Sequence, residues 1–166
     1  DGNYIYGAKL NSDMRTMDDS TITCLISPEE AWETNKAKVA EGPFMLKKDG
    51  VYYLTYSGSH FESDYYGSGY ATATSPLGNY TKYENNPIIP HPPEGYDESN
   101  FRDPKVWKHG DWYYTVVGVQ TKEESGQVVV YKSQDLINWE FLNIMATSSV
   151  KENLGFMWEC PDRKST

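Results

Sequence analysis

An internal repeat constrains the fold more than any other feature of the sequence. A turn dipeptide followed by an aromatic run that ends at glycine occurs three times, at residues 1–7, 49–58 and 109–118. A short turn of this kind, placed before a β-type run, is typical of a β-hairpin. Because repetition at a fixed spacing marks repeat architectures, the chain is expected to be built from similar β units.

Each repeat continues in a similar way after its aromatic run. Residues 69–75 and 126–133 read as strands that run into a serine turn, and residues 78–83 and 135–140 follow them. Each unit therefore supplies about four short strands in roughly 50 to 60 residues, as the blade of a β-propeller does. The composition agrees, since 14% of the residues are aromatic and long amphipathic helical patterns are missing. The sequence predicts an all-β, incomplete β-propeller with two to three blades.

The chain is expected to form one partial propeller domain over residues 1–166. A propeller of 4 to 8 blades needs more chain, so we expect either a fragment or a homodimer in which two copies complete the ring. The last inner strand is expected around residues 156–162. Residues 27–33 read as one helical turn, residues 85–95 as a proline-rich connection between blades, and residues 163–166 as a tail.

Charge and composition exclude several classes of partner. Fifteen Lys and Arg residues face 24 Asp and Glu residues, a net charge of -9, which disfavours binding to nucleic acid. No run approaches the roughly 18 apolar residues of a membrane span, and the first residues lack the basic region of a signal peptide. Cys24 and Cys160 are too few for a disulfide framework, although one bridge stays open, and the compartment is left open. His60 and His91 stand alone, so no metal or cofactor is expected.

An acidic residue stands one or two positions before a proline ahead of two of the repeated turns, and a third motif of this kind occurs near the end of the sequence. The three segments are Glu41-Gly42-Pro43, Arg102-Asp103-Pro104, and Glu159-Cys160-Pro161. If these segments are the innermost strands of successive blades, their carboxylates point into one central funnel. Glycoside hydrolysis needs such groups, because one carboxylic acid protonates the leaving oxygen while a second carboxylate activates water or attacks the sugar.

Two resemblances to known families follow from these motifs. Residues 41–57 resemble glycoside hydrolase family 43, the arabinanases, arabinofuranosidases and xylosidases, and this likeness implies that Glu41 is a general acid. Residues 100–107, 133–140 and 158–162 resemble glycoside hydrolase family 32, the invertases, inulinases and levanases. That likeness implies that Asp103 stabilises the transition state and grips fructosyl hydroxyls, and that Glu159 is the acid/base catalyst.

Both families are five-bladed propellers, so the chain resembles a family 43-like half at 1–84 joined to a family 32-like half at 85–162. It departs from both patterns. The Asn-Asp-Pro motif with the nucleophile of family 32 is missing, and so are the base and the second, pKa-tuning Asp of family 43. Retention and inversion require carboxyl groups about 5–5.5 Å or about 6.5–9.5 Å apart, a choice the sequence leaves open.

Each candidate residue also has a purely structural interpretation. Glu41 could simply enter a hairpin, Asp103 could pair with Arg102, and Glu159 could end a strand in solvent. We favour a functional role for all three residues. For Glu159 the reason is that Trp158 and Cys160 suggest a partly buried strand, which would raise the pKa of its carboxyl group. Among the neighbours of the acids, the residues expected to bind substrate are Arg102, Trp158 and Trp107.

The sequence therefore predicts a glycosidase that cleaves furanosidic bonds in an oligosaccharide or polysaccharide. The substrates expected from the resemblances are β-fructofuranosides or α-L-arabinofuranosides and β-xylosides. The alternative is a carbohydrate-binding, truncated or chimeric propeller fragment without catalysis.

Overall fold

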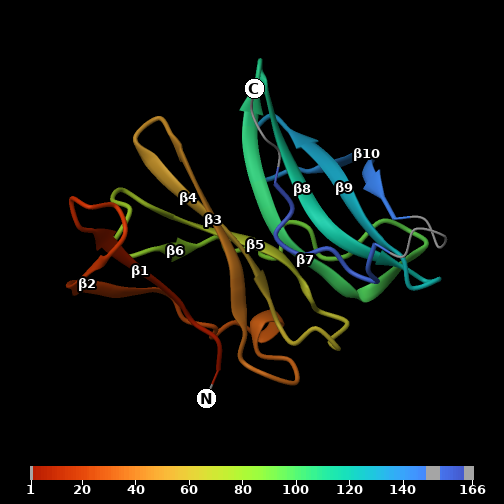
Figure 1. Cartoon of the computed structure of the whole chain (residues 1–166), viewed down its shortest axis with the longest axis horizontal. Helices are drawn as coiled ribbons and strands as arrows, with labels where there is room; N and C mark the ends of the chain where they lie inside the picture. The colour runs from red at the N-terminus through yellow and green to blue at the C-terminus, as the bar shows by residue number, and fades with distance from the viewer. Residues whose placement is uncertain (1, 149–153, 163–166) are drawn as a thin grey trace.

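The computed structural model describes residues 2–148 and 154–162, and almost all of its regular structure is β-strand. A two-stranded antiparallel sheet and two four-stranded sheets make up the fold (Figure 1). The strands are β1 (Ile5–Leu10), β2 (Met17–Ile26), β3 (Ala40–Lys48), β4 (Val51–Gly58), β5 (Gly67–Ala73), β6 (Thr81–Lys82), β7 (Tyr96–His109), β8 (Trp112–Thr121), β9 (Gly126–Ser133) and β10 (Glu140–Thr147).

Each four-stranded sheet is a meander in which neighbours in sequence pair antiparallel. The order is β3-β4-β5-β6 in one sheet and β7-β8-β9-β10 in the other, so β3 and β7 are equivalent edge strands. β3 and β7 pack against each other, and the hydroxyl of Thr55 in β4 donates to the carbonyl of Pro104 in β7 at 3.4 Å. The two sheets are the propeller blades that the repeat predicts, and the described strands form no closed ring.

The repeated turn joins the first two strands of each blade. Asp49 and Gly50, between β3 and β4, have φ values of 49° and 82°. Two consecutive positive φ values are the signature of a type I′ turn, whose twist suits a two-residue hairpin. The first copy of the motif is different, because β1 runs straight through Gly7 and pairs with β2. The strand end expected at Gly7 is therefore wrong, while Asp1 of the expected turn lies outside the described residues.

The strand expected at residues 156–162 is also wrong. Residues 154–162 form no strand, and the amide of Gly126 donates to the carbonyl of Gly155 at 3.2 Å. Gly155 has a φ of 101°, which lies far from extended backbone. The segment lies over Gly126, which begins β9, and over Gly118 within β8, where the carbonyl of Trp158 occupies the space that a Cβ on Gly118 would need. The tail expected at residues 163–166 lies outside the described residues.

Aromatic and aliphatic side chains fill the space between the blades. Buried Val106, Tyr113 and Leu136 of the second blade pack against Phe44 and Tyr53 of the first. Large rings such as these bury much apolar area in a domain made of short strands. The same packing holds β3 beside β7.

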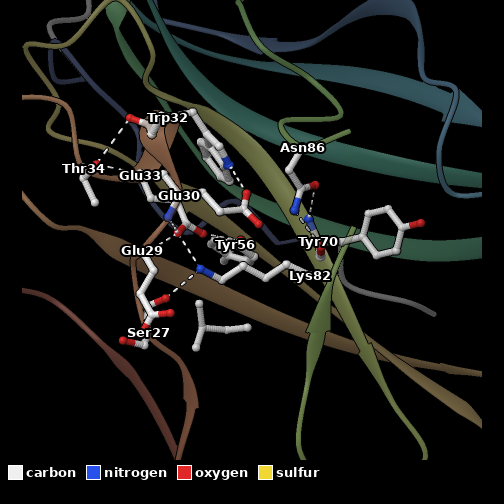
Figure 2. Close-up of polar contacts among 12 residues, drawn as sticks. Ser27, Glu29, Glu30, Trp32, Glu33, Thr34, Tyr56, Tyr70, Lys82 and Asn86 are labelled. Carbon is white, nitrogen blue, oxygen red and sulfur yellow. Dashed lines mark hydrogen bonds and ion pairs between the residues drawn. The ribbon is translucent and has the colours of Figure 1, made fainter. Parts of the chain in front are cut away.

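A buried ionic cluster anchors the segment that leads into β3 (Figure 2). Glu33 ends the 3-10 helix η1 (Ala31–Glu33), within the residues expected to form one helical turn, and its side chain is 0% exposed. Its Oε1 accepts a hydrogen bond from the hydroxyl of Tyr56 at 2.6 Å, while its Oε2 forms an ion pair with Lys82 and accepts from two backbone amides. Trp32 lies against Gly58 and Gly69, so the cluster joins η1 to β4, β5 and β6.

Apolar side chains are exposed on the first hairpin and on the last strand of the described fold. They are Tyr6, Leu10, Met17 and Ile22 in the β1–β2 hairpin and Phe141, Leu142, Ile144 and Met145 in the edge strand β10. The homodimer expected from the sequence stays a prediction. No helix within residues 2–148 and 154–162 is long and apolar enough to span a membrane.

Candidate functional site

The acidic motifs of the first two blades lie at identical β-bulges. In β3, Glu41 pairs with Ser57 and Phe44 pairs with Thr55, so two residues face one on the partner strand. In β7, Arg102 and Lys105 flank the same one-residue excess opposite β8. Proline explains the bulge, because Pro43 and Pro104 have no N–H to donate to a ladder and prolines are tolerated within sheets at such irregularities.

The residue before each proline has a left-handed backbone in all three motifs. The φ values are 57° at Gly42, 63° at Asp103 and 48° at Cys160. The repeat therefore aligns Asp103 with Gly42, and Arg102 with Glu41 and Glu159. The sequence analysis treats Glu41 and Asp103 as copies of one another, whereas the backbone places them at successive positions of the motif. An acid thus occurs twice at one position and once at the next.

These motifs line a single cavity of about 760 Å³, a volume within the range of small-molecule sites. The carboxylates of Glu41, Asp103 and Glu159 and the guanidinium of Arg102 come together there from β3, β7 and the C-terminal segment. Its lining residues are Glu41, Gly42, Pro43, Phe61, Asn100, Arg102, Asp103, Phe156, Glu159 and Cys160. The three predicted acids thus meet at one cavity, while their chemical roles stay predictions.

Glu41 is half-buried and fixed by a neighbouring phenol. The hydroxyl of Tyr66, which is 1% exposed, donates to Oε1 of Glu41 at 2.5 Å, and the side-chain amide of Asn3 donates to Oε2 at 3.4 Å. Burial and the negative charge of Glu41 raise the pKa of Tyr66 far above its usual value, so the phenol keeps its proton and acts as a donor. Glu41 thus has a defined position at the cavity, and its chemical role stays a prediction.

Arg102 connects the acids across the cavity. Its Nε donates to Oε1 of Glu159 at 3.0 Å, another of its nitrogens donates to Oδ1 of Asn100 at 3.0 Å, and its guanidinium lies 5.8 Å from the ring centroid of Tyr66. Burial alone would lower the pKa of Arg102, but its interactions with Tyr66, Glu159 and Asp103 outweigh burial and raise it. Arg102 therefore supplies a permanent positive charge among the three carboxylates.

Asp103 is oriented by two backbone contacts. Its amide donates to the hydroxyl of buried Ser57 at 3.0 Å, and its Oδ2 accepts from the amide of Cys160 at 2.8 Å. The side chain passes so close to Gly42 that a Cβ there would lie 2.2 Å from its Oδ1. The Asp103 carboxylate and partial burial raise the pKa of the Cys160 thiol, so this thiol stays protonated at neutral pH.

Glu159 is more open than the sequence analysis predicts. Its side chain is 63% exposed and it belongs to no strand, so the expectation of a partly buried strand around it is wrong. The carboxylate is nevertheless held toward the cavity by the ion pair with Arg102. Arg102 thus forms its ion pair with Glu159 and not with Asp103, the partner weighed in the sequence analysis.

The two tryptophans predicted to bind substrate lie outside the lining of this cavity. Trp107 stacks on Tyr114 at 5.5 Å, on the β7–β8 surface that faces Val130 and Leu142. Trp158 turns back along its own segment, where its Nε1 donates to the carbonyl of Leu154 at 2.7 Å. Neither position follows from closeness to an acid in sequence, because Trp107 lies beyond the bulge at Asp103 and Pro104, which shifts the alternation of side chains along β7, and Trp158 belongs to no strand. Stacking of sugars by these two residues is therefore not supported by their positions.

The sequence analysis missed three aromatic residues at or beside the cavity. Tyr66 holds Glu41, and Phe61 and Phe156 line the opening. Phe61 and Tyr66 belong to the loop between β4 and β5, whose place beside the acids depends on the blade, so no local pattern marks them. Phe156 comes only three residues before Glu159, and that proximity is the one signal that could have indicated it.

The site combines ionisable oxygens with fixed donors and no metal cluster. Within the part of the chain that the structure describes, no three His, Cys, Asp or Glu side chains are arranged to hold a metal ion. The three carboxylates can accept hydrogen bonds from hydroxyl groups, exchange protons and balance a developing positive charge, whereas the guanidinium of Arg102 only donates hydrogen bonds. These are the abilities that sugar chemistry requires.

Comparison with known proteins points to the same chemistry. The family model "Glycosyl hydrolases family 32 N-terminal domain" matches residues 20–165. A sucrose-6-phosphate hydrolase from Bacillus subtilis is 37% identical over 120 residues, which are 70% of this chain and 24% of that enzyme. The chain thus spans about a quarter of the length of this curated relative.

Solved structures share the fold over most of the chain. An endo-1,4-β-xylanase from Bacteroides thetaiotaomicron superposes with a TM-score of 0.72 at 30% identity, covering 86% of this chain and 51% of that one. A family 32 β-fructofuranosidase from Bombyx mori superposes with a TM-score of 0.69 at 27% identity, covering 97% and 37%. Both likenesses agree with an incomplete propeller.

The comparisons bear on the two resemblances differently. One family 32 match covers most of the segment 1–84 that resembles family 43, and no separate family 43 half is found. A thermostable family 43 glycoside hydrolase superposes with a TM-score of 0.69 at 26% identity, over 84% of this chain and 48% of that one. The family 32 resemblance is confirmed, and the family 43 resemblance has support from the fold alone.

Proposed function

Because this chain belongs to glycosyl hydrolase family 32, we propose that its protein is a furanosidase-type glycosidase that cleaves β-fructofuranosides. The observation that carries this proposal is the meeting of Glu41, Asp103 and Glu159 around Arg102 in one cavity. The names of the relatives, a sucrose-6-phosphate hydrolase and a β-fructofuranosidase, support a fructosyl substrate.

Asp103 is proposed to bind the hydroxyl groups of the reacting sugar. Its backbone amide and its Oδ2 are both anchored, at 3.0 Å to Ser57 and at 2.8 Å to Cys160, and Oδ1 points toward Gly42. A carboxylate held in this way accepts hydroxyl hydrogen bonds without first having to be ordered. Its negative charge also stabilises the oxocarbenium-like transition state of glycoside hydrolysis.

Glu159 is proposed as the acid/base catalyst. Its exposure lets water reach the carboxylate, which the hydrolytic step requires, and Arg102 fixes its orientation. Glu41 is the second candidate for the general acid, because Tyr66 and Asn3 hold it at the same cavity. The Asn-Asp-Pro motif of the family 32 nucleophile does not occur in this sequence, so the proposal assigns no nucleophile to this chain.

A substrate panel tests the proposal. Sugar release is measured from sucrose, inulin, levan, arabinan and nitrophenyl arabinofuranoside and xyloside, with wild-type protein and with Glu159→Gln, Glu41→Gln and Asp103→Asn. We expect release from a fructoside that Glu159→Gln lowers by about 10²–10⁴-fold, the usual effect of a general acid/base. Glu140→Gln is the matched control, since Glu140 pairs with Lys132 on β9, outside the lining of the cavity.

The panel also separates the other interpretations. Sugar release from arabinan or an arabinofuranoside that depends on Glu41 alone would indicate the activity of family 43 instead. Binding of a sugar with no release from any substrate would support the non-catalytic carbohydrate-binding alternative. Unchanged fructoside hydrolysis in both Glu159→Gln and Glu41→Gln would refute the proposed mechanism.

A further inference from the structure

Two phenyl rings with large exposed areas line the cavity that holds the acids. Phe61 is 48% exposed and Phe156 is 63% exposed. They come from the β4–β5 loop and from the C-terminal segment, which are far apart in sequence. An apolar ring that faces water costs free energy, and two such rings at one polar cavity mark a surface that a ligand covers.

The loop that carries Phe61 is held in place before any ligand arrives. The ring of Phe61 stacks on His60, with centroids 4.6 Å apart and planes inclined by 27°. The backbone amide of Glu62 donates to Nδ1 of His60 at 3.2 Å, and the hydroxyl of Ser63 donates to the side chain of Asn35 at 2.9 Å. A ring fixed in this way loses little conformational freedom on binding a ligand.

The segment that carries Phe156 is also tied to the blade. The carbonyl of Gly155 accepts from the amide of Gly126, and the indole of Trp158 closes back on the carbonyl of Leu154. Phe156 lies between these two contacts, three residues before Glu159. Its position relative to the acids therefore depends on a short anchored stretch rather than on a free end.

Two of the three acids, Glu41 and Asp103, are less exposed than the rings, while Glu159 is as exposed as Phe156. Glu41, Arg102 and Asp103 are half-buried and held by Tyr66, Asn100 and Ser57, whereas the two rings are among the exposed residues. The sugar that reacts has to reach the carboxylates, so a ring at the opening contacts the next sugar of the substrate. The planar face of phenylalanine is suited to the apolar C–H face of a sugar ring, and it offers no hydrogen bond to one particular hydroxyl.

We propose that Phe61 and Phe156 form the binding surface for the sugar attached to the reacting furanoside, the leaving-group side of the substrate. This inference rests on the proposed function and assigns Phe61 and Phe156 to the leaving-group side of its site. The two rings take the role that the sequence analysis gave to Trp107 and Trp158.

The test compares a substrate that has a leaving-group sugar with one that does not. Dissociation constants for sucrose and for methyl β-D-fructofuranoside are measured by NMR titration in the Glu159→Gln background, which prevents turnover. We expect Phe61→Ala and Phe156→Ala each to weaken sucrose binding about tenfold, or about 1.4 kcal/mol, and to change methyl fructoside binding less than twofold. Tyr65→Ala and Leu154→Ala are matched controls, because both residues are exposed neighbours outside the cavity lining.

Two results would overturn the inference. One is an equal loss for both ligands, which would place the rings on the fructosyl side or show a general disturbance. The other is unchanged sucrose binding, or no sucrose binding by the parent protein. Failure of the proposed function gives a different result, which is that wild-type protein does not hydrolyse methyl fructoside. In that case the dissociation constants for sucrose and methyl fructoside are compared in the wild-type background instead.

Discussion

Replacement of Lys82 by methionine removes the only cation from the buried Glu33 cluster within the described residues. Lys82 forms an ion pair with the Glu33 carboxylate and donates to the carbonyl of Ser27 at 2.6 Å, and its side chain is only 17% exposed. Methionine keeps most of the stem volume, so packing changes little while the charge is lost. Glu33, which has no exposed surface, is then left without a counter-charge.

The expected cost follows from the burial of the remaining carboxylate. Removing one partner of a buried ion pair typically destabilises a protein by about 3–5 kcal/mol. Tyr56 and two backbone amides still donate to Glu33, so the loss is expected near the lower end, about 3 kcal/mol. That loss is a large share of the total, because folded domains are stable by only about 5–15 kcal/mol.

Urea unfolding followed by tryptophan fluorescence measures this change. At a typical urea dependence of about 1–3 kcal/mol per molar, the midpoint is expected to fall by about 1 M or more. Lys132→Met is the matched control, since Lys132 pairs at 3.3 Å with Glu140, whose side chain is 70% exposed. Exposed pairs contribute about 0–1 kcal/mol. Equal midpoint shifts in the two variants would refute the idea that burial makes the Glu33 pair important.

Three further predictions concern the site and its supporting blade. Gly42→Ala should destabilise the protein more than Gly50→Ala in urea unfolding, and it should also weaken sucrose binding. Both glycines have positive φ, but only a Cβ at Gly42 meets Asp103. Equal destabilisation by the two substitutions would contradict the steric argument. Tyr66→Phe should lower the free energy of unfolding by about 1.5–3 kcal/mol, because it removes a buried hydrogen bond to a carboxylate. A decrease below about 0.5 kcal/mol in urea unfolding would contradict this prediction. Burial would raise the pKa of Asp135, but hydrogen bonds from Asn138, Ile137 and Ser133 outweigh burial and hold that pKa below its usual value. The lowered pKa of Asp135 adds stability that is present above about pH 4 and lost as pH falls further, so Asp135→Asn should flatten the acid limb of a stability-pH curve between about pH 4 and 2. An acid limb as steep as that of wild-type protein would show that these hydrogen bonds do not stabilise the charged form.

Local chemistry explains which parts of the fold the sequence predicts. The Asp49-Gly50 turn favours positive φ at two successive residues, so a hairpin there needs little help from distant contacts. Repetition then places β3 and β7 at equivalent positions in two blades. The strand expected at residues 156–162 fails because a strand needs a neighbouring strand to pair with, and a propensity for extended structure cannot supply one.

The site was predictable where it follows the repeat and unpredictable where it depends on how blades pack. The proline-containing motifs indicate where Glu41, Asp103 and Glu159 meet. The contact of Tyr66 with Glu41 crosses 25 residues, and that of Arg102 with Glu159 crosses 57, so neither follows from local spacing. The side on which Trp107 and Trp158 lie depends on strand alternation and on a turn in the last segment, features that proximity to an acid does not reveal.

The release of fructose from sucrose, measured as an initial rate for wild-type protein, Asp103→Asn, Glu159→Gln and the control Glu140→Gln, tests the central claim most directly. The account predicts that the two cavity substitutions lower kcat by at least about a hundredfold, because each removes a charged group at the reacting sugar, while the control keeps the wild-type rate. Wild-type rates in Asp103→Asn and Glu159→Gln would contradict the claim that this cavity performs the hydrolysis.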